Sequence, residues 1–218
     1  MNDALINING NGMQSLELIF LITFITLLPS IIIMMTSFTR IIIVLSFLRN
    51  ALGIQQTPPN TVLVGIALFL TLFIMTPVLD DINTNAYIPY KNEEINSQQA
   101  LDRASKPMKE FMLRQTEVDT LDMFVQFSGE ELTDNYEEIP LKVIIPSFIT
   151  SELKRAFIIG FLLFLPFLLI DIVVSSTLMS MGMIMLPPAM ISLPFKILLF
   201  ITVDGWQLLF STLIKGFN

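Results

Sequence analysis

Long apolar stretches separated by polar ones dominate the chain and predict membrane-type helices. Residues 18–39 and 61–79 contain no charged side chain, and each is long enough to cross a bilayer as a helix rising about 1.5 Å per residue. The sequence TPPN at residues 57–60 lies between them, and proline is tolerated at the first position of a helix. The two stretches therefore predict a helical hairpin, with Pro29 interrupting its first arm.

A second apolar block, residues 148–218, contains several prolines and isolated charges. Pro166 and Asp171 are expected to interrupt its first half, and the adjacent Pro187 and Pro188 to break it in the middle, because proline lacks an N–H and displaces the preceding residue from helical geometry. Interrupted apolar segments are tolerated in a membrane only where protein or water covers them. This block predicts a second, kinked hairpin.

A polar insert separates the two blocks. Residues 80–142 hold 14 acidic and 6 basic side chains, whereas the rest of the chain holds 5 acidic and 6 basic ones. Apolar positions recur at helical spacing within residues 95–112, where Pro107 is expected to kink or divide a helix, and again within residues 117–129. The sequence thus predicts an all-α, integral membrane-type protein with two kinked helical hairpins and a mainly helical soluble insert. Its predicted segments are a polar N-terminal segment (1–14), the first apolar hairpin (15–79), the acidic insert (80–147) and the second apolar hairpin (148–218).

Composition narrows the possible functions. The chain is 53% hydrophobic and 14% charged, with a mean hydropathy of +0.71, whereas about a quarter of the residues of a soluble domain are charged. Cysteine and histidine are absent, which excludes thiol catalysis, disulfides and the usual zinc and haem ligands. We expect no enzymatic activity, no cofactor and no bound metal. The sequence has no basic patch of the kind that binds nucleic acid, so we expect no nucleic-acid partner. Residues 1–14 show no signal-peptide pattern.

The sequence MSMGMIMLPP at residues 179–188 combines methionines at every second position with the Pro-Pro break. In extended or loop backbone this spacing places the side chains on one side. One interpretation is that flexible methionines fill an irregular membrane core. The other is that they form a soft apolar constriction, which excludes ions and still repacks around a passing polypeptide.

Single charges inside the apolar blocks are a further signal, because a charge at the centre of a membrane costs about 2.5–3.5 kcal/mol and normally has a partner. These residues are Arg40, Arg49, Glu152, Asp171, Lys196 and Asp204. Folding at the Pro-Pro break would bring Glu152 and Lys196 to the open end of the hairpin, where they could pair within or between subunits or extend to an interface. Asp171 and Asp204 could also form an aspartyl protease pair, although neither lies in a recognisable motif of that class.

Several long motifs resemble the FliP family, the export-gate proteins of flagellar type III secretion that are related to the SctR proteins of injectisomes. The resemblance covers both apolar blocks. It rests on FTRIIIVLSFLRNALGIQQTPPN (38–60), ALFLTLFIMTP (67–77), SFITSELKRAFIIGF (147–161), MSMGMIMLPP (179–188) and ISLPFKILLFITVDGWQLL (191–209).

The resemblance implies a subunit of a helical, pore-containing complex with FliQ-like and FliR-like chains, in the bacterial inner membrane at the flagellar basal body. FlhB-like and FlhA-like components are expected partners, and unfolded flagellar proteins are the expected cargo. The family's methionine gasket falls on Met183, Ile184 and Met185, with isoleucine in place of the usual middle methionine. The family's ion pair between subunits falls on Glu152 and Lys196.

An alternative function is a stand-alone channel or secondary transporter for small solutes, which the broken helices alone would support. Such a protein would purify as a monomer or small homo-oligomer, whereas a gate subunit would purify with its partner chains. The sequence contains no P-loop, so other components are expected to supply the energy of export.

Overall fold

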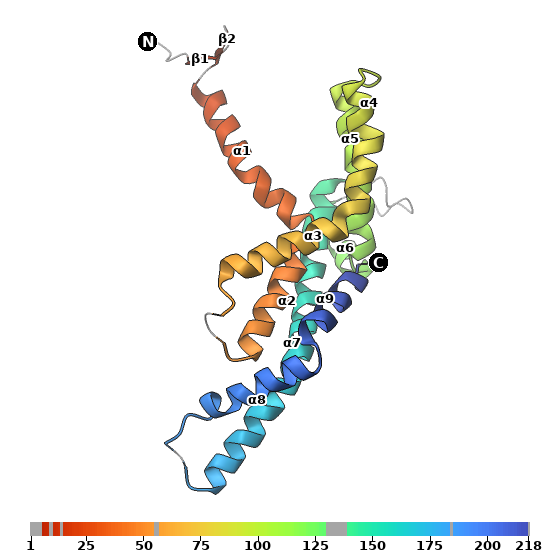
Figure 1. The fold of residues 1–218 in the computed structure, drawn as a ribbon. Coiled ribbons are helices and arrows are strands. Elements are labelled where there is room, and N and C mark those ends of the chain that lie inside the picture. The colour runs from red at the N-terminus through yellow and green to blue at the C-terminus, as the bar shows by residue number, and fades with distance from the viewer. Residues whose placement is uncertain are drawn as a thin grey trace.

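The computed structural model describes residues 6–8, 11–13, 15–54, 57–129, 139–183 and 185–217 of the protein. Within these residues the chain is helical (Figure 1), apart from a short antiparallel pair of strands, β1 (Ile6–Ile8) and β2 (Asn11–Met13). The helical elements are α1 (Ser15–Met34), α2 (Phe38–Ala51), α3 (Asn60–Ile82), η1 (Asn83–Tyr87), α4 (Ile88–Lys91), α5 (Ser97–Gln115), α6 (Val118–Ser128), α7 (Leu141–Ser180), α8 (Pro188–Thr202) and α9 (Gly205–Lys215). The all-α fold class predicted from the sequence is confirmed.

The first predicted span, residues 18–39, is divided between two helices. Helix α1 runs through position 29 without a break and ends at Met34, and α2 begins at Phe38. The hydroxyl of Thr36 donates to the carbonyl of Ile33 at 2.7 Å and accepts from the N–H of Phe38 at 3.4 Å. Hydroxyl side chains compete in this way for backbone hydrogen bonds. The interruption predicted at Pro29 was therefore wrong, and the break lies between Met34 and Phe38 instead.

Helices α2 and α3 form a hairpin that packs against the long helix α7 (Figure 1). Helix α2 buries Ile41, Val44, Leu45 and Leu48, whose spacing of three and four residues places them on one face of a helix. This face meets both α3 and α7, so most of the core lies around α2. The hairpin predicted for this region is thus present, with α2 as its first arm.

The described part of the insert is mainly helical, as predicted. Helix α3 continues through the π-helix η1 into α4, and α5 returns alongside η1 (Figure 1). Asn96 begins α5 with a capping box, in which its side chain accepts from the N–H of Gln99 and its own N–H donates to the side chain of Gln99. Helix α5 is continuous through Pro107, which is buried together with Phe111 and Met112. Division at this proline, one of the two outcomes expected, does not occur, because packing of the buried face keeps the helix together on both sides.

Helix α7 is the central helix of the fold, against which several other helices pack. It spans 40 residues without a break and includes Pro146, Pro166 and Asp171, which gives it a length of about 60 Å. The interruptions predicted at Pro166 and Asp171 were therefore wrong. Helix α7 contacts α2, α5, α6 and α8, and these contacts keep it continuous where its sequence alone predicts a break. A close approach to α2 occurs at Gly160, where a Cβ atom would lie 2.5 Å from the Phe47 ring.

Two continuous helical stretches are long and apolar enough to cross a membrane, Asn60–Lys91 and Leu141–Ser180. A third potential crossing consists of α8 and α9, which are bent by 61° relative to each other. These features are consistent with the predicted membrane-type helical protein.

Candidate functional site

The most extensive polar contact in the described part of the chain joins Arg40 of α2 to Glu152 of α7. Arg40 is 2% exposed and Glu152 is fully buried. The Nε atom of Arg40 donates to Oε2 of Glu152 at 2.8 Å, and Nη2 donates to Oε1. This bidentate geometry matches the planar guanidinium to the carboxylate. A charged pair without water is stable only when its remaining polar atoms are also satisfied.

Residues from the insert and from the segment after α9 complete this network. Nη2 of Arg40 also donates to Oε1 of Gln115 at 3.0 Å, and Nη1 donates to the carbonyl of Gly216 at 3.0 Å. Gln115 in turn donates to the carbonyl of Phe217 at 3.1 Å. The Phe217 ring lies 3.7 Å from the guanidinium carbon and stacks on Phe111 of α5. The network therefore ties α2, α5, α7 and the segment after α9 together at one point.

A second polar cluster lies between α7 and α8. Lys196 is 5% exposed, and its Nζ donates to Oδ2 of Asp171 at 2.6 Å and to the carbonyl of Ala51 at 3.1 Å. Ser192 donates to the other Asp171 oxygen at 2.6 Å. Ala51 is the last residue of α2, where free carbonyls and the helix dipole favour a cation. Lys196 thereby fastens α8 to both α7 and α2.

Glu152 and Lys196 do not pair with each other within the chain. The partner of Lys196 is Asp171, which lies roughly 28 Å along α7 from Glu152. The expectation that both charges lie at the same end of the hairpin is therefore wrong within one chain. A pair between Glu152 of one copy and Lys196 of another stays a prediction.

The other two charges selected from the sequence differ in their surroundings. Arg49 is half-buried, and its Nη1 donates to Asn60 and, at 3.5 Å, to the carbonyl of Pro58. It thus bridges the turn between α2 and α3. Asp204 is exposed, so the buried position expected for it is not found in this chain. It adopts a left-handed conformation with φ of 51° at the bend between α8 and α9, a region that aspartate tolerates better than most residues.

The turn between α7 and α8 has a defined backbone on its α7 side. Gly182 has φ of 76°, and the N–H groups of Gly182 and Met183 donate to the carbonyls of Met179 and Leu178 at 3.0 Å each. This is the Schellman arrangement that ends a helix at a left-handed glycine. Helix α8 starts at Pro188, where a missing N–H has no cost. The predicted break is therefore a helix stop followed by a helix start.

Methionine side chains at this turn point outward from the chain. The exposed fraction is 68% for Met181, 43% for Met183 and 98% for Met185, and Ile184 lies outside the described residues. The turn lies at the opposite end of α7 from the insert (Figure 1). These methionines do not fill a core within the chain, which leaves them available to contact other molecules or to line an opening.

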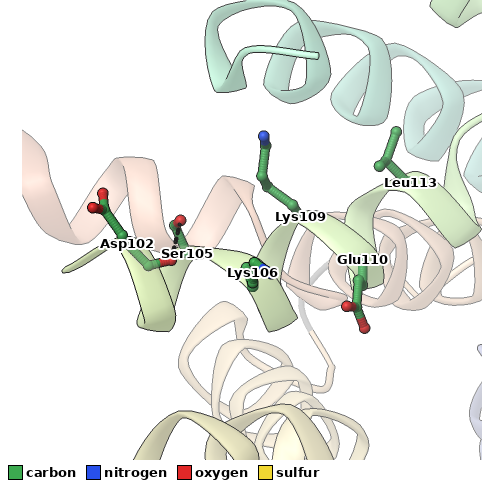
Figure 2. A pocket seen from close by; sticks show the side chains of 6 residues that line it. All are labelled: Asp102, Ser105, Lys106, Lys109, Glu110 and Leu113. Atoms are coloured by element: carbon green, nitrogen blue, oxygen red, sulfur yellow. Dashed lines mark hydrogen bonds between the residues drawn. The ribbon is translucent and has the colours of Figure 1, made fainter. Parts of the chain in front are cut away.

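A polar hollow along α5 shows no catalytic arrangement. Ser105, Lys109 and Leu113 line it with Asp102, Lys106 and Glu110, all from α5. Figure 2 shows Lys109 and Glu110 pointing in opposite directions, and the hydroxyl of Ser105 donates to the backbone carbonyl of Asp102 at 2.8 Å. The charges alternate around one helix surface instead of converging on a shared point.

The protease alternative finds no support in the surroundings of its two aspartates. Asp171 is bound by a lysine and a serine hydroxyl, whereas aspartyl proteases use two carboxylates that share a proton. Asp204 is exposed at the bend. Within the described ranges, no group of three or more acidic side chains is placed to hold a metal ion.

The sequence is similar to those of known proteins. A model described as the FliP family matches residues 21–213. The flagellar biosynthetic protein FliP of Pectobacterium carotovorum subsp. carotovorum is 52% identical over 95% of this chain and 82% of its own length. The protein of the same name from Bacillus subtilis (strain 168) is 49% identical over 95% of this chain and 94% of its own length. That of Buchnera aphidicola subsp. Acyrthosiphon pisum (strain APS) is 52% identical over 92% of this chain but only 53% of its own length. A match of this extent, on a helical chain able to cross a membrane, means that the protein belongs to the FliP family of flagellar biosynthetic proteins, components of the flagellar export apparatus.

Proposed function

We propose that the protein is a core subunit of the flagellar type III export gate in the bacterial inner membrane, at the base of the flagellum. In this proposal several copies assemble with FliQ-like and FliR-like chains around a pore, next to FlhB-like and FlhA-like components. Unfolded flagellar proteins cross the membrane through the pore. The turn between α7 and α8 forms its narrowest part.

The observation that carries the proposal is the exposed methionine turn. Met183 and Met185 are 43% and 98% exposed at the end of a 40-residue helix. Apolar side chains brought together from several copies would exclude water and ions by dewetting. Methionine is unbranched and flexible, so its side chain can move aside for a passing polypeptide and then close again.

Exposed apolar helix faces support assembly with other chains. Phe161 and Leu169 of α7 are 62% and 65% exposed, and Phe69 and Phe73 of α3 are 76% and 65% exposed. Apolar surface of this extent is covered by lipid or by other subunits. The ion pair between Glu152 and Lys196 of neighbouring copies is part of the proposal. It requires each residue to exchange its partner within the chain, Arg40 or Asp171, for one in the next copy.

The deciding experiment replaces Met183, Ile184 and Met185 with alanine in the assembled complex. The substitution removes side-chain volume from a turn that is fixed by helices on both sides. We expect vesicles that hold the complex to leak small ions while export continues. A complex with phenylalanine at the same positions should stay impermeable to ions but export more slowly, because a rigid ring cannot easily repack around a passing polypeptide.

The matched control is the pair Met179→Ala and Met190→Ala, which flank the turn and are 67% and 71% exposed. Complexes with these substitutions should leak far fewer ions, since both residues lie outside the proposed constriction. A triple-alanine complex that is as tight to ions as the parent would refute the proposed constriction. Purification in mild detergent tests the assembly: a chain that never carries FliQ-like and FliR-like subunits with it would favour a stand-alone channel.

A further inference from the structure

We propose that residues 216–217 form a latch that holds α9 in place as one wall of an apolar groove, and that α9 opens as a unit about the bend at Asp204 when the latch is released. The device is built into the single chain, so it does not depend on the partners proposed above. It rests on three features: a latch at one end of α9, a hinge at the other, and a groove beside the helix.

The latch is the contact of Gly216 and Phe217 with the Arg40 network. The carbonyls of both residues accept side-chain hydrogen bonds, from Arg40 at 3.0 Å and from Gln115 at 3.1 Å. The Phe217 ring, 8% exposed, contacts both the Arg40 guanidinium and the ring of Phe111. The donors belong to α2 and α5, so the contact joins the end of α9 to elements far from it in sequence.

The hinge is the junction between α8 and α9. The two helices meet at 61°, and Asp204 has φ of 51°, a conformation that costs roughly 1–2 kcal/mol for a residue other than glycine. Lys196 fastens α8 to Asp171 and to the carbonyl of Ala51. Helices α8 and α9 are thus held by two separate polar clusters, one on each side of the bend. Releasing one cluster leaves the other in place.

The groove lies between α7 and the bent pair of α8 and α9. Its walls are apolar, and α9 supplies one of them. The lining includes Leu163 and Phe167 of α7, Phe200 of α8, and Leu208 and Leu209 of α9. Leu209 is 7% exposed, so its side chain becomes accessible only if α9 moves away. The latch therefore determines whether the inner face of α9, which includes Leu209, is covered.

The absence of cysteine from the sequence permits a direct test by thiol labelling of the full chain in detergent. One variant carries Leu209→Cys on the buried face of α9. The matched control carries Leu178→Cys, which is similarly buried at 9% exposed and lies in the groove between α7 and α8. Each variant is labelled with a maleimide, with and without Phe217→Ala. Phe217→Tyr retains the ring and serves as the conservative comparison.

Phe217→Ala should raise the labelling rate at position 209 on the order of tenfold, because loss of a cation–π contact and an aromatic pair shifts the closed state by about one decade. The rate at position 178 should stay unchanged, and Phe217→Tyr should label like the parent. An unchanged rate at position 209 would overturn the latch. Equal increases at both positions would also overturn it, since the whole chain would then be loosened instead of α9 alone.

Discussion

Replacing Glu152 with glutamine tests the Arg40 network most directly. Glutamine has nearly the same shape but no charge, so the Arg40 guanidinium, 2% exposed, would lose its counterion. Breaking one partner of a buried ion pair costs about 3–5 kcal/mol. In a chain of this size each kcal/mol corresponds to roughly 2–4 °C in Tm. We therefore expect Glu152→Gln to lower the Tm of the purified chain by roughly 6–20 °C.

The fluorescence of Trp206, the only tryptophan in the sequence, provides the assay. Trp206 lies edge-on to Phe200, with ring centroids 5.3 Å apart, and its ring centroid is 5.6 Å from that of Phe210. Unfolding of the α8–α9 region therefore changes the surroundings of Trp206. Heating the detergent-solubilised chain while recording this signal gives the Tm of the parent and of each variant.

The control is the ion pair between Lys154 and Glu117, whose N–O distance is 2.6 Å but whose side chains are 59% and 25% exposed. A solvated pair of this kind contributes less than about 1 kcal/mol, so Lys154→Met should lower the Tm by less than about 4 °C. The reasoning would be refuted if Glu152→Gln lowered the Tm no more than Lys154→Met does.

Two further predictions concern close packing and assembly. Gly160→Ala should destabilise the chain, because the new Cβ would overlap the Phe47 ring on α2. Gly65→Ala, whose new Cβ would have no neighbour within 4 Å, should stabilise α3 by up to about 1 kcal/mol. Thermal unfolding of both variants checks this. Glu152→Lys or Lys196→Glu alone should block complex formation, and the double exchange should restore part of it, as judged by co-purification with partner subunits. A double exchange no better than either single change, in variants that still unfold cooperatively on heating, would show that the two residues do not pair between copies.

Local sequence signals predicted the helical class, the acidic insert and the break at Pro187 and Pro188. They did so because hydrophobic periodicity, charge density and backbone chemistry act over only a few residues. The same signals failed at Pro166 and Asp171, where α7 is continuous, and the division considered at Pro107 does not occur. Contacts with neighbouring helices outweigh the local cost of a proline, and no sequence window contains those contacts.

The pairing of the buried charges was decided only by the tertiary structure. The sequence identified Arg40, Glu152, Asp171 and Lys196 as expensive to bury, because that cost depends on the side chain itself. It did not reveal that Arg40 binds Glu152 or that Lys196 binds Asp171. The other participants, Gln115 and the backbone carbonyls of residues 51, 216 and 217, carry no signal in the sequence. A backbone carbonyl is present at every position, and only the packing of α2, α5, α7 and α9 determines which of them a buried cation reaches.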